Sequence, residues 1–491
     1  MHYLVEYPMG KQRMENHLKQ MILNMKYEYE EGRVSAMGLC GAVIQKLPLP
    51  LLEENTQLLF LPLVLQLAND ESKVCREKIT ECISFLLKRL STKLLLSLYE
   101  YAVRWLAGKD KQLSQISVQI FGFYVDNRLD FMKRGNRLEE LTNCLHLCLV
   151  NEIGSIENTS ILLGKEWEMS YFCLLCIEKL NNQSSNIISK KTELWVELIK
   201  FLVHPHPWIK QTSSRIIWSY ISELDAHTLV QTFSGEKKSF LVEVPGPLFQ
   251  IARNLCRQLG DDEEKQVEAI STLAIRSLTW VIKAMHSHPA LCFNEEYKKE
   301  CDPKNDLDGN DEKVTTTTLS NPVAWLMTRL SHIAKLQGVK RRETIFKCFA
   351  AFASSCDAHI LSPHLELILQ PLNRVLTETK SQHDHNLKRV NNTSIESEPI
   401  ISLTKDVLDI LEEKCGTELF LNAYSIVKTK AKQKRDFRKQ AIAVENVHDP
   451  QAAAKRRIFK QQKEKNRRKR RVEERKSSRG VFGKKFRHTD H

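Results

Sequence analysis

The sequence contains little glycine and little proline. Among its 491 residues there are 17 glycines and 15 prolines, well below the average usage of roughly 7% and 5%. Because both residues interrupt regular structure, their scarcity argues against a turn-rich architecture and favours helices. The chain is also longer than the roughly 250–300 residues at which one hydrophobic core stops growing, so we expect several domains or an elongated stack.

Long hydrophobic runs are absent as well. The longest apolar run, Leu58 to Leu65, has eight residues and contains Pro62, whereas a membrane-spanning helix needs about 20. Residues Met1 to Lys11 contain no apolar stretch that ends in small residues, as a signal peptide would. We therefore expect neither a membrane partner nor secretion.

The cysteines do not form a disulfide pattern. There are 13, an odd number, and most lie in apolar stripes with helical spacing, namely Cys75, Cys82, Cys173, Cys176 and Cys348. The pairs Cys144/Cys148 and Cys173/Cys176 have spacings found in zinc sites, but leucines fill the intervals. Thiols in such runs behave as small hydrophobes, so we expect core packing and a reducing compartment, the cytosol or the nucleus.

Catalytic and cofactor motifs are missing from the chain. The segment Ser234–Lys238 resembles part of a phosphate-binding loop but lacks its first glycine. We find no His-Glu-x-x-His pattern, no Gly-x-Ser-x-Gly elbow and no glycine-framed acid pair. The sequence therefore predicts no enzyme, no cofactor, no metal and no small-molecule substrate. An RNA-modifying enzyme remains a minor alternative, which would require clustered acids or a cysteine–base pair in a pocket.

Amphipathic helices recur along the chain. After the polar turn 69–72, apolar residues follow at i, i+4, i+7, i+8, i+11, i+12 and i+15: Cys75, Ile79, Cys82, Ile83, Leu86, Leu87 and Leu90. Similar stripes begin near residues 113, 209 and 345, and the turn residue Asp110 lies forty positions beyond Asp70. This spacing predicts helix pairs that repeat about every 40–47 residues.

That period is typical of HEAT and armadillo solenoids, in which each helix pair buries its apolar face against its neighbours. The sequence therefore predicts an all-α fold, a HEAT/armadillo-like α-solenoid with a basic, partly disordered or helical C-terminal tail. An irregular helical bundle is the alternative. We expect helical repeats over residues 1–293 and 322–427, a polar disordered insertion over 294–321, a loop over 380–399 and the tail over 428–491.

The net positive charge of the chain lies in the tail. Residues 428–491 contain 24 Lys+Arg and 7 Asp+Glu, a net charge of +17, whereas residues 1–427 contain 49 basic and 53 acidic residues. Such a segment is too polar to bury a core. Asp449 and Pro450 resemble the start of a helix, which we expect to extend from about 450 to 476.

Polyphosphate is the natural counterpart of this tail. The predicted RNA-binding residues are Lys455, Arg456, Arg457, Arg467, Arg468, Lys469, Arg470 and Arg471. The unbroken run Arg467, Arg468, Lys469, Arg470 and Arg471 also reads as a nuclear localisation signal. No feature of the tail indicates base specificity. The alternatives are a merely solvated tail and, less favoured, an anionic membrane surface.

One turn, His204-Pro205-His206-Pro207-Trp208, could be read as a metal or binding site. We favour a rigid turn between helices, because proline restricts the backbone, with Trp208 packed on the next helix pair.

Several islands of sequence resemble one protein family. They are Glu6–Lys11, Tyr27–Arg33, His204–His206 followed by Trp208, Pro322–Leu326, Arg329–Ser331 and Ile333–Leu336. Together with the lysine- and arginine-rich tail, they are similar in order and place to the C-terminal region of small-subunit processome component 20, the family also called down-regulated in metastasis. Members of that family are several times longer than this chain.

The resemblance implies a HEAT-repeat scaffold of the nucleolus. It implies precursor ribosomal RNA, a small nucleolar RNA particle and other processome proteins as partners, a role in precursor ribosomal RNA processing for the small subunit, and no catalytic residues. The alternative is a nuclear transport or adaptor solenoid that binds proteins. Regular Trp/Asn ladders would mark an import receptor, and we do not find them.

Overall fold

The computed structural model describes residues 10–156, 167–188, 191–229, 239–260, 267–301, 321–336, 338–386 and 398–451, and the shorter stretches 454–459, 461–463, 465–466 and 468–469. All regular secondary structure in these ranges is helical. The chain divides into unit 1, Met1–Cys415, and unit 2, Gly416–His491. No helix within the described ranges combines the length and the apolar character that a membrane span requires.

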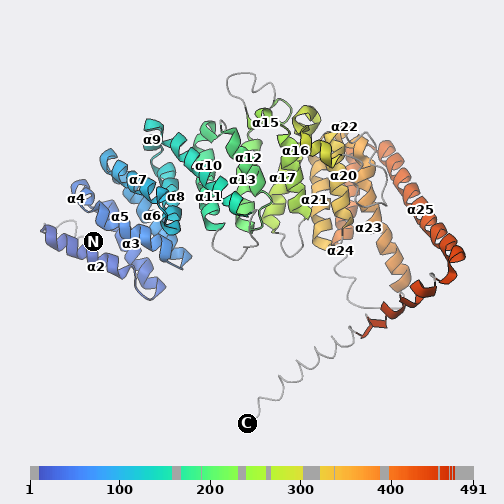
Figure 1. Cartoon of the computed structure of the whole chain (residues 1–491), viewed down its shortest axis with the longest axis horizontal. Coiled ribbons are helices and arrows are strands. Elements are labelled where there is room, and N and C mark those ends of the chain that lie inside the picture. The colour runs from blue at the N-terminus through green and yellow to red at the C-terminus, as the bar shows by residue number, and fades with distance from the viewer. Residues whose placement is uncertain are drawn as a thin grey trace, which may run out of the picture. The chain divides into compact units, whose positions relative to one another are not determined.

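The helices of unit 1 form two rows, and within each row they follow the order of the chain (Figure 1). In the first row each helix contacts the next: α3 (Glu30–Lys46), α6 (Lys73–Arg89), α8 (Lys111–Asn127), α11 (Trp167–Ile188), α13 (Pro207–Ser222), α17 (Glu268–Ser287), α21 (Val339–Ser355) and α24 (Glu398–Cys415). The second row supplies one partner to each of these: α2 (Lys11–Asn24), α5 (Thr56–Asn69), α7 (Thr92–Ala107), α10 (Arg137–Ile156), α12 (Thr192–Phe201), α16 (Pro247–Gly260), α20 (Pro322–Lys335) and α23 (Leu365–Asn386).

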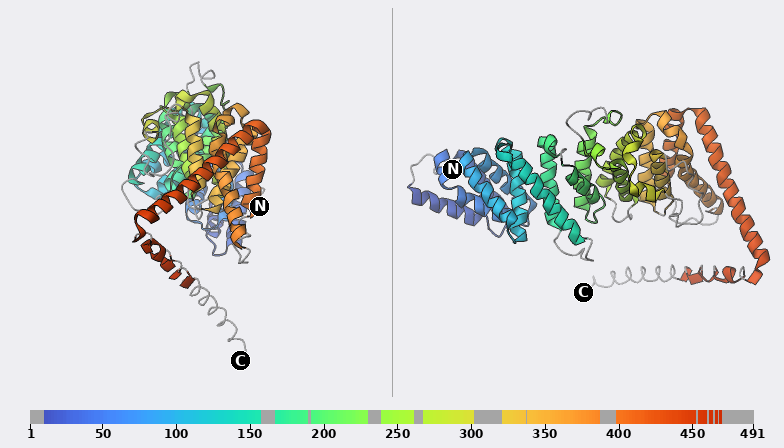
Figure 2. Two further views of the ribbon diagram at one scale, coloured as in Figure 1. Left: turned by 90° about the vertical axis from the view of Figure 1, so that its right-hand side faces the viewer. Right: turned by 45° about the horizontal axis from the view of Figure 1, so that its top comes forward.

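This order is that of a HEAT/armadillo-like α-solenoid, so the predicted fold class is confirmed and the irregular bundle is set aside. The right-hand view of Figure 2 shows the same succession from a second direction. Short helical segments occupy some of the connections: α4 (Leu49–Glu54), α9 (Leu129–Met132), η1 (Arg134–Asn136), α15 (Phe240–Glu243), η3 (Pro289–Cys292), α18 (Glu295–Glu300), α22 (Ala358–Leu361) and η5 (Ser362–His364).

The core consists of the predicted stripes. In α6 the buried residues are Cys75, Ile79, Cys82, Ile83, Leu86 and Leu87, as the spacing predicts. The stripes of α8, α13 and α21 are buried along most of their length. Side chains at the turns begin these helices: the Ser72 hydroxyl accepts a hydrogen bond from the N–H of Cys75, and the Asp110 carboxylate accepts from Gln112 and Leu113. The local pattern therefore explains both where the helices start and which face they bury.

Arginines connect successive helices of the first row. Arg89, the last residue of α6, donates to the carbonyl of Ile44 and, at 2.7 Å, to that of Leu47 at the end of α3. Arg128, directly after α8, donates to Leu87 at 3.2 Å and Leu90 at 3.0 Å at the end of α6. The carbonyls at a helix C-terminus lack partners within the helix. Each arginine therefore satisfies the end of the preceding repeat.

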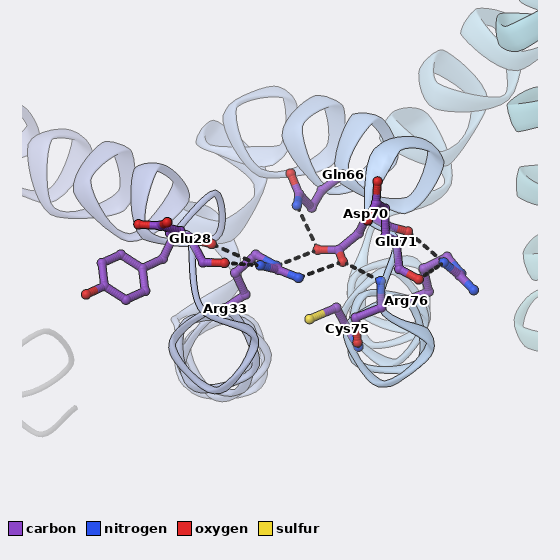
Figure 3. Close-up of polar contacts among 9 residues, drawn as sticks. Glu28, Arg33, Gln66, Asp70, Glu71, Cys75 and Arg76 are labelled. Atoms are coloured by element: carbon purple, nitrogen blue, oxygen red, sulfur yellow. Dashed lines mark hydrogen bonds and ion pairs between the residues drawn. The ribbon is translucent and has the colours of Figure 1, made fainter. Parts of the chain in front are cut away.

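A second polar network joins the first pairs of the stack (Figure 3). Arg33 donates to the carboxylate of Asp70 and to the carbonyls of Tyr27 and Glu28. Gln66 and the backbone N–H of Ser72 also donate to that carboxylate. Arg76 repeats part of this arrangement one unit later by donating to the carbonyls of Asp70 and Glu71. The turns between helices are thus held by side chains as well as by their own backbone.

The expected interruptions lie partly outside the described residues. Helix α18 falls within the segment 294–321, of which residues 302–320 are not described. The loop proposed over 380–399 is helical at both ends, because α23 continues to Asn386 and α24 begins at Glu398, and residues 387–397 lie outside the described residues. The proposed start of the tail at residue 428 lies inside the helix Thr417–His448 of unit 2.

The expectation that the cysteines pack in the core is correct for most of them. Cys173 and Cys176 are buried, and burial raises the pKa of Cys176 to about 12. The prediction was wrong for Cys144, which is exposed, and only partly right for Cys148, which is half-buried. Leucines surround both pairs in sequence, but the apolar stripe of α10 runs through Leu141, Leu145 and Leu149, so Cys144 lies on the neighbouring face.

Candidate nucleic-acid interface

Unit 2 begins with one long helix, α25 (Thr417–His448). It starts directly after Gly416, whose φ of 86° lies in the left-handed region that favours glycine. Alanine, lysine, glutamine and arginine dominate its second half, and all four are strong helix formers. Near its start Tyr424 stacks on Phe420, and the Lys428 ammonium lies 4.2 Å from the centre of the Tyr424 ring. From Lys428 to Lys439 the helix carries seven lysines and arginines.

Four exposed cations share one face of α25. Lys428, Lys432, Arg435 and Lys439 are spaced at i, i+4, i+7 and i+11, and all four are exposed. At 3.6 residues per turn these positions fall within a narrow arc, and at 1.5 Å per residue they extend over about 16 Å. The result is a row of positive charge along the helix, on a scale that matches several consecutive phosphates of a nucleic acid.

A second group of cations lies on another face of the same helix, at Lys430, Lys434 and Arg438. Partial burial and, secondarily, the charge of Arg438 one turn away lower the pKa of Lys434. Between Lys428 and Lys439 only Asp436 is acidic. Positive charge therefore predominates over this stretch of α25.

The structure places five of the eight predicted RNA-binding residues on helical segments after α25. Lys455, Arg456 and Arg457 are exposed and helical, as are Arg468 and Lys469. The remaining three, Arg467, Arg470 and Arg471, lie outside the described residues. The helix breaks at Asp449 and resumes at Pro450, where the sequence predicts a new start, and every described residue from 450 to 469 is helical.

Sequence reasoning nominated only the distal cations and missed the row on α25. Its signal was present in the sequence, since Lys428, Lys432, Arg435 and Lys439 follow helical spacing without interruption. The same segment also carries four apolar side chains, Phe437, Ile442, Val444 and Val447, and all four are exposed.

The His-Pro-His-Pro turn connects α12 to α13 as a rigid link, in agreement with the favoured interpretation. The Nδ1 atom of His204 accepts a hydrogen bond from the N–H of His206 at 3.0 Å, and Pro207 is the first residue of α13. Burial lowers the pKa of His204 to about 4. Among the residues that the structure describes, no three His, Cys, Asp or Glu side chains are grouped so as to hold a metal ion.

The placement of Trp208 differs from the prediction. Trp208 does not pack on the next helix pair but lies against Trp167 and Tyr171 of the preceding pair, and it is 54% exposed. The reason is that residue 208 follows the first helical position of α13, on the side that faces α11. The turn therefore presents an indole ring at the surface of unit 1.

Comparison with known proteins places the chain in a family. Residues 180–474 match the family described as small subunit processome component 20 homolog, C-terminal. The chain belongs to this family. The match covers the second half of the unit 1 stack, α25 and most of the basic segment that follows, and it confirms the resemblance found in the sequence islands.

Two curated relatives cover nearly the whole chain. U3 small nucleolar RNA-associated protein 20 of Saccharomyces cerevisiae is 24% identical over 469 residues, 93% of this chain and 17% of the relative. The protein of the same name from Schizosaccharomyces pombe is 22% identical over 475 residues, 92% of this chain and 17% of the relative. The chain thus spans about a sixth of the length of these relatives.

Solved helical-repeat structures resemble the chain more distantly. Importin beta has a TM-score of 0.37 at 12% identity and covers 84% of this chain and 50% of its own. A designed armadillo repeat protein has a TM-score of 0.30 at 12% identity and covers 54% of this chain and 99% of its own.

Proposed function

We propose that this chain is a non-catalytic scaffold of the small-subunit processome that acts in the processing of precursor ribosomal RNA in the nucleolus. In this proposal the solenoid of unit 1 binds other processome proteins, and the cationic helices of unit 2 bind RNA. The partners are precursor ribosomal RNA and the small nucleolar RNA particle to which the relatives' names refer. No metal, cofactor or small-molecule substrate takes part.

The segregation of charge is the observation that carries this proposal. Residues 1–427 hold 49 basic and 53 acidic residues, whereas residues 428–491 have a net charge of +17. In unit 2 the cations on α25 and at Lys455, Arg456, Arg457, Arg468 and Lys469 are displayed on exposed helices. Exposed lysines and arginines without shaped pockets suit phosphate contacts, which give affinity but little sequence readout.

Tethering combines these two activities in one mechanism. A solenoid docked on protein partners holds the cationic helices near any RNA within reach, which raises their effective concentration without a new contact. Several weak contacts then act together. Scaffolding of this kind requires no reacting group.

The proposal is tested by a salt series with structured precursor ribosomal RNA and the full chain. In one variant Lys455, Arg456, Arg457, Arg468 and Lys469 are changed to glutamine. In the control, five exposed lysines of unit 1 are changed to glutamine: Lys26, Lys88, Lys93, Lys109 and Lys133. Each lost phosphate contact lowers the salt slope by about 0.7–0.9, so the tail variant should lose about 3.5–4.5 in slope and the control almost nothing.

An equal loss in both variants would contradict the proposal, because affinity would then depend on net charge rather than on unit 2. A second variant removes four charges from α25, at Lys428, Lys432, Arg435 and Lys439, and should lower the slope by about 3.

Nuclear import is tested separately, with Arg467–Arg471 replaced by glutamines in a fluorescent fusion. We expect loss of nuclear accumulation. Retention of the nuclear signal would assign import to another segment.

A further inference from the structure

A surface cavity of about 180 Å³ lies in unit 1 between α11 and α13. Its lining residues are Tyr171, Trp208, Gln211, Thr212 and Arg215. Tyr171 belongs to α11 and the other four to α13. Since Trp208 is 54% exposed, its ring can be reached from solvent. The cavity thus combines two aromatic walls with three polar side chains.

Ring contacts hold the aromatic wall in place. Trp167 stacks on His206 with ring centres 3.9 Å apart and planes at 11°, and it meets Trp208 edge-on at 5.2 Å and 77°. Trp208 lies 5.8 Å from Tyr171. Four aromatic rings from α11, α13 and the turn that precedes α13 therefore support one another, and they fix the indole of Trp208 without covering it.

The polar side of the cavity is ordered as well. The Arg215 Nε donates to Glu178 at 2.7 Å and its Nη2 donates to the other carboxylate oxygen at 2.9 Å. Nη2 also donates to the hydroxyl of Thr212 at 3.3 Å, and that hydroxyl donates to the carbonyl of Trp208 at 2.9 Å. Arg215 is thus held at the wall by charge-assisted hydrogen bonds in a fixed geometry.

These features select among possible ligands. A methylated ammonium is not favoured, because no acidic side chain is among the residues that line the cavity and could balance its charge. A phosphate is not favoured either, because Glu178 already neutralises Arg215. A flat, uncharged heterocycle with polar edges suits both sides, since it can stack on Trp208 and Tyr171 while Gln211 and Arg215 offer hydrogen bonds to its edge.

We propose that this cavity binds one unpaired nucleobase of single-stranded RNA, with Trp208 as the stacking platform and Gln211 and Arg215 at the base edge. The inference rests on the proposed function, because an RNA held by the cations of unit 2 also carries bases at high local concentration for unit 1. It adds a contact to the base, whereas the cations contact only phosphate.

The test measures binding of a short fluorescent oligoadenylate to the full chain at one fixed salt concentration. Trp208→Ala should weaken binding about 5- to 150-fold, the range expected for one stacked base. The matched control is Trp105→Ala, which removes a half-buried indole stacked on Tyr101 in the same unit, outside this cavity. It should leave the affinity unchanged.

Two comparisons separate base binding from phosphate binding. An oligonucleotide of equal length with abasic sites should bind wild type and Trp208→Ala equally well. Trp208→Ala should also leave the salt slope unchanged, whereas the five-cation variant of unit 2 lowers it. Failure of the five-cation variant to change the slope would count against the proposed function, and failure of Trp208→Ala to weaken binding would count against this site alone.

Two further variants keep the test decisive if Trp208→Ala unfolds the chain, which circular dichroism would reveal. Trp208→Phe retains a flat ring and should keep most of the affinity, and Gln211→Ala should weaken binding while the stack remains. The result that overturns the proposal is full affinity in Gln211→Ala together with a loss of affinity in Trp105→Ala, because binding would then depend on an indole outside the cavity. The proposal is also overturned if the cavity captures an aromatic or proline-containing peptide and this peptide has no effect on the binding of oligoadenylate.

Discussion

Arg33 and Asp70 form a two-pronged ion pair between the first and second helix pairs of the solenoid. The Nε atom of Arg33 lies 3.0 Å from Oδ2 of Asp70, and Nη2 lies 3.2 Å from Oδ1 (Figure 3). The side chain of Asp70 is 1% exposed and that of Arg33 16%. A pair this deeply buried stabilises the fold only while both partners and their hydrogen bonds are present.

Removal of Asp70 should therefore destabilise the start of the stack. In Asp70→Ala, Arg33 keeps the carbonyls of Tyr27 and Glu28 but loses its counter-charge, and the loss of the hydrogen bonds to the Asp70 carboxylate should cost about 1.5–3 kcal/mol. The measurement is hydrogen exchange of amides in α3 and α6, which reports local opening. Unaltered protection there, with α21 and α24 as internal reference, would show that the pair contributes little.

The same pair predicts a response to acid. Burial acts to raise the pKa of Asp70, but hydrogen bonds from Gln66, Ser72 and Arg33 outweigh it and lower the pKa. A carboxylate with a lowered pKa contributes stability above its ordinary value of about 3.9, and this contribution is lost as the pH falls through the lowered folded value. The protection of α3 should thus persist at mildly acidic pH and fall only below that range, and Asp70→Asn should abolish this dependence.

Arg89 and Arg128 should each stabilise the stack through the helix ends that they satisfy. Replacement by methionine keeps much of the apolar stem but leaves carbonyls of the preceding helix without donors, at a cost of about 1.5–3 kcal/mol per arginine. Urea unfolding of the full chain measures this cost. Arg104→Met is the control, because Arg104 is 70% exposed and forms an ion pair with Glu100 and a ring contact with Tyr101, both within its own helix. A shift as large in the control would refute the repeat-specific role.

His204 should make stability depend on pH below neutrality. Burial lowers its pKa from the ordinary 6.5 to about 4. The unfolded chain therefore binds a proton that the folded chain excludes, so stability decreases as the pH falls from about 6.5 towards 4. His204→Asn should flatten this part of the profile, which is measured as the urea midpoint at a series of pH values. Titration of the His204 ring by NMR near 6.5 would contradict the expectation.

Cys144 should be the first thiol to react with a maleimide under native conditions. It is exposed, whereas Cys148 is half-buried and the other 11 cysteines are buried. Partial burial raises the pKa of Cys144, so the rate of labelling should increase steeply with pH above neutrality. Mass spectrometry after brief labelling identifies the site, and Cys144→Ser should remove the modification. Equal labelling of Cys173 would indicate that α11 opens in solution.

The sequence supported a large part of the fold and only part of the candidate sites. The stripe from Cys75 to Leu87 and the start at Asp110 follow from local rules, because helical periodicity and capping act within a few residues. The cations at Lys455 and Arg468 could be identified from the sequence equally well, because the charge of a side chain is evident without knowledge of its neighbours. The cavity at Trp208 was not, because Tyr171 and Trp208 meet only when α11 and α13 pack.

By itself, the sequence determined that this chain forms amphipathic helices in a repeating order and that its net positive charge lies after residue 427. Only the tertiary structure decided that Arg33 reaches Asp70, that Arg89 caps the end of α3, and that Trp208 faces the preceding pair rather than the next. The physical reason is that periodicity specifies which face of a helix is buried. Which residues meet across that face depends on how neighbouring repeats are set against one another, and that is decided by packing between segments far apart in the chain.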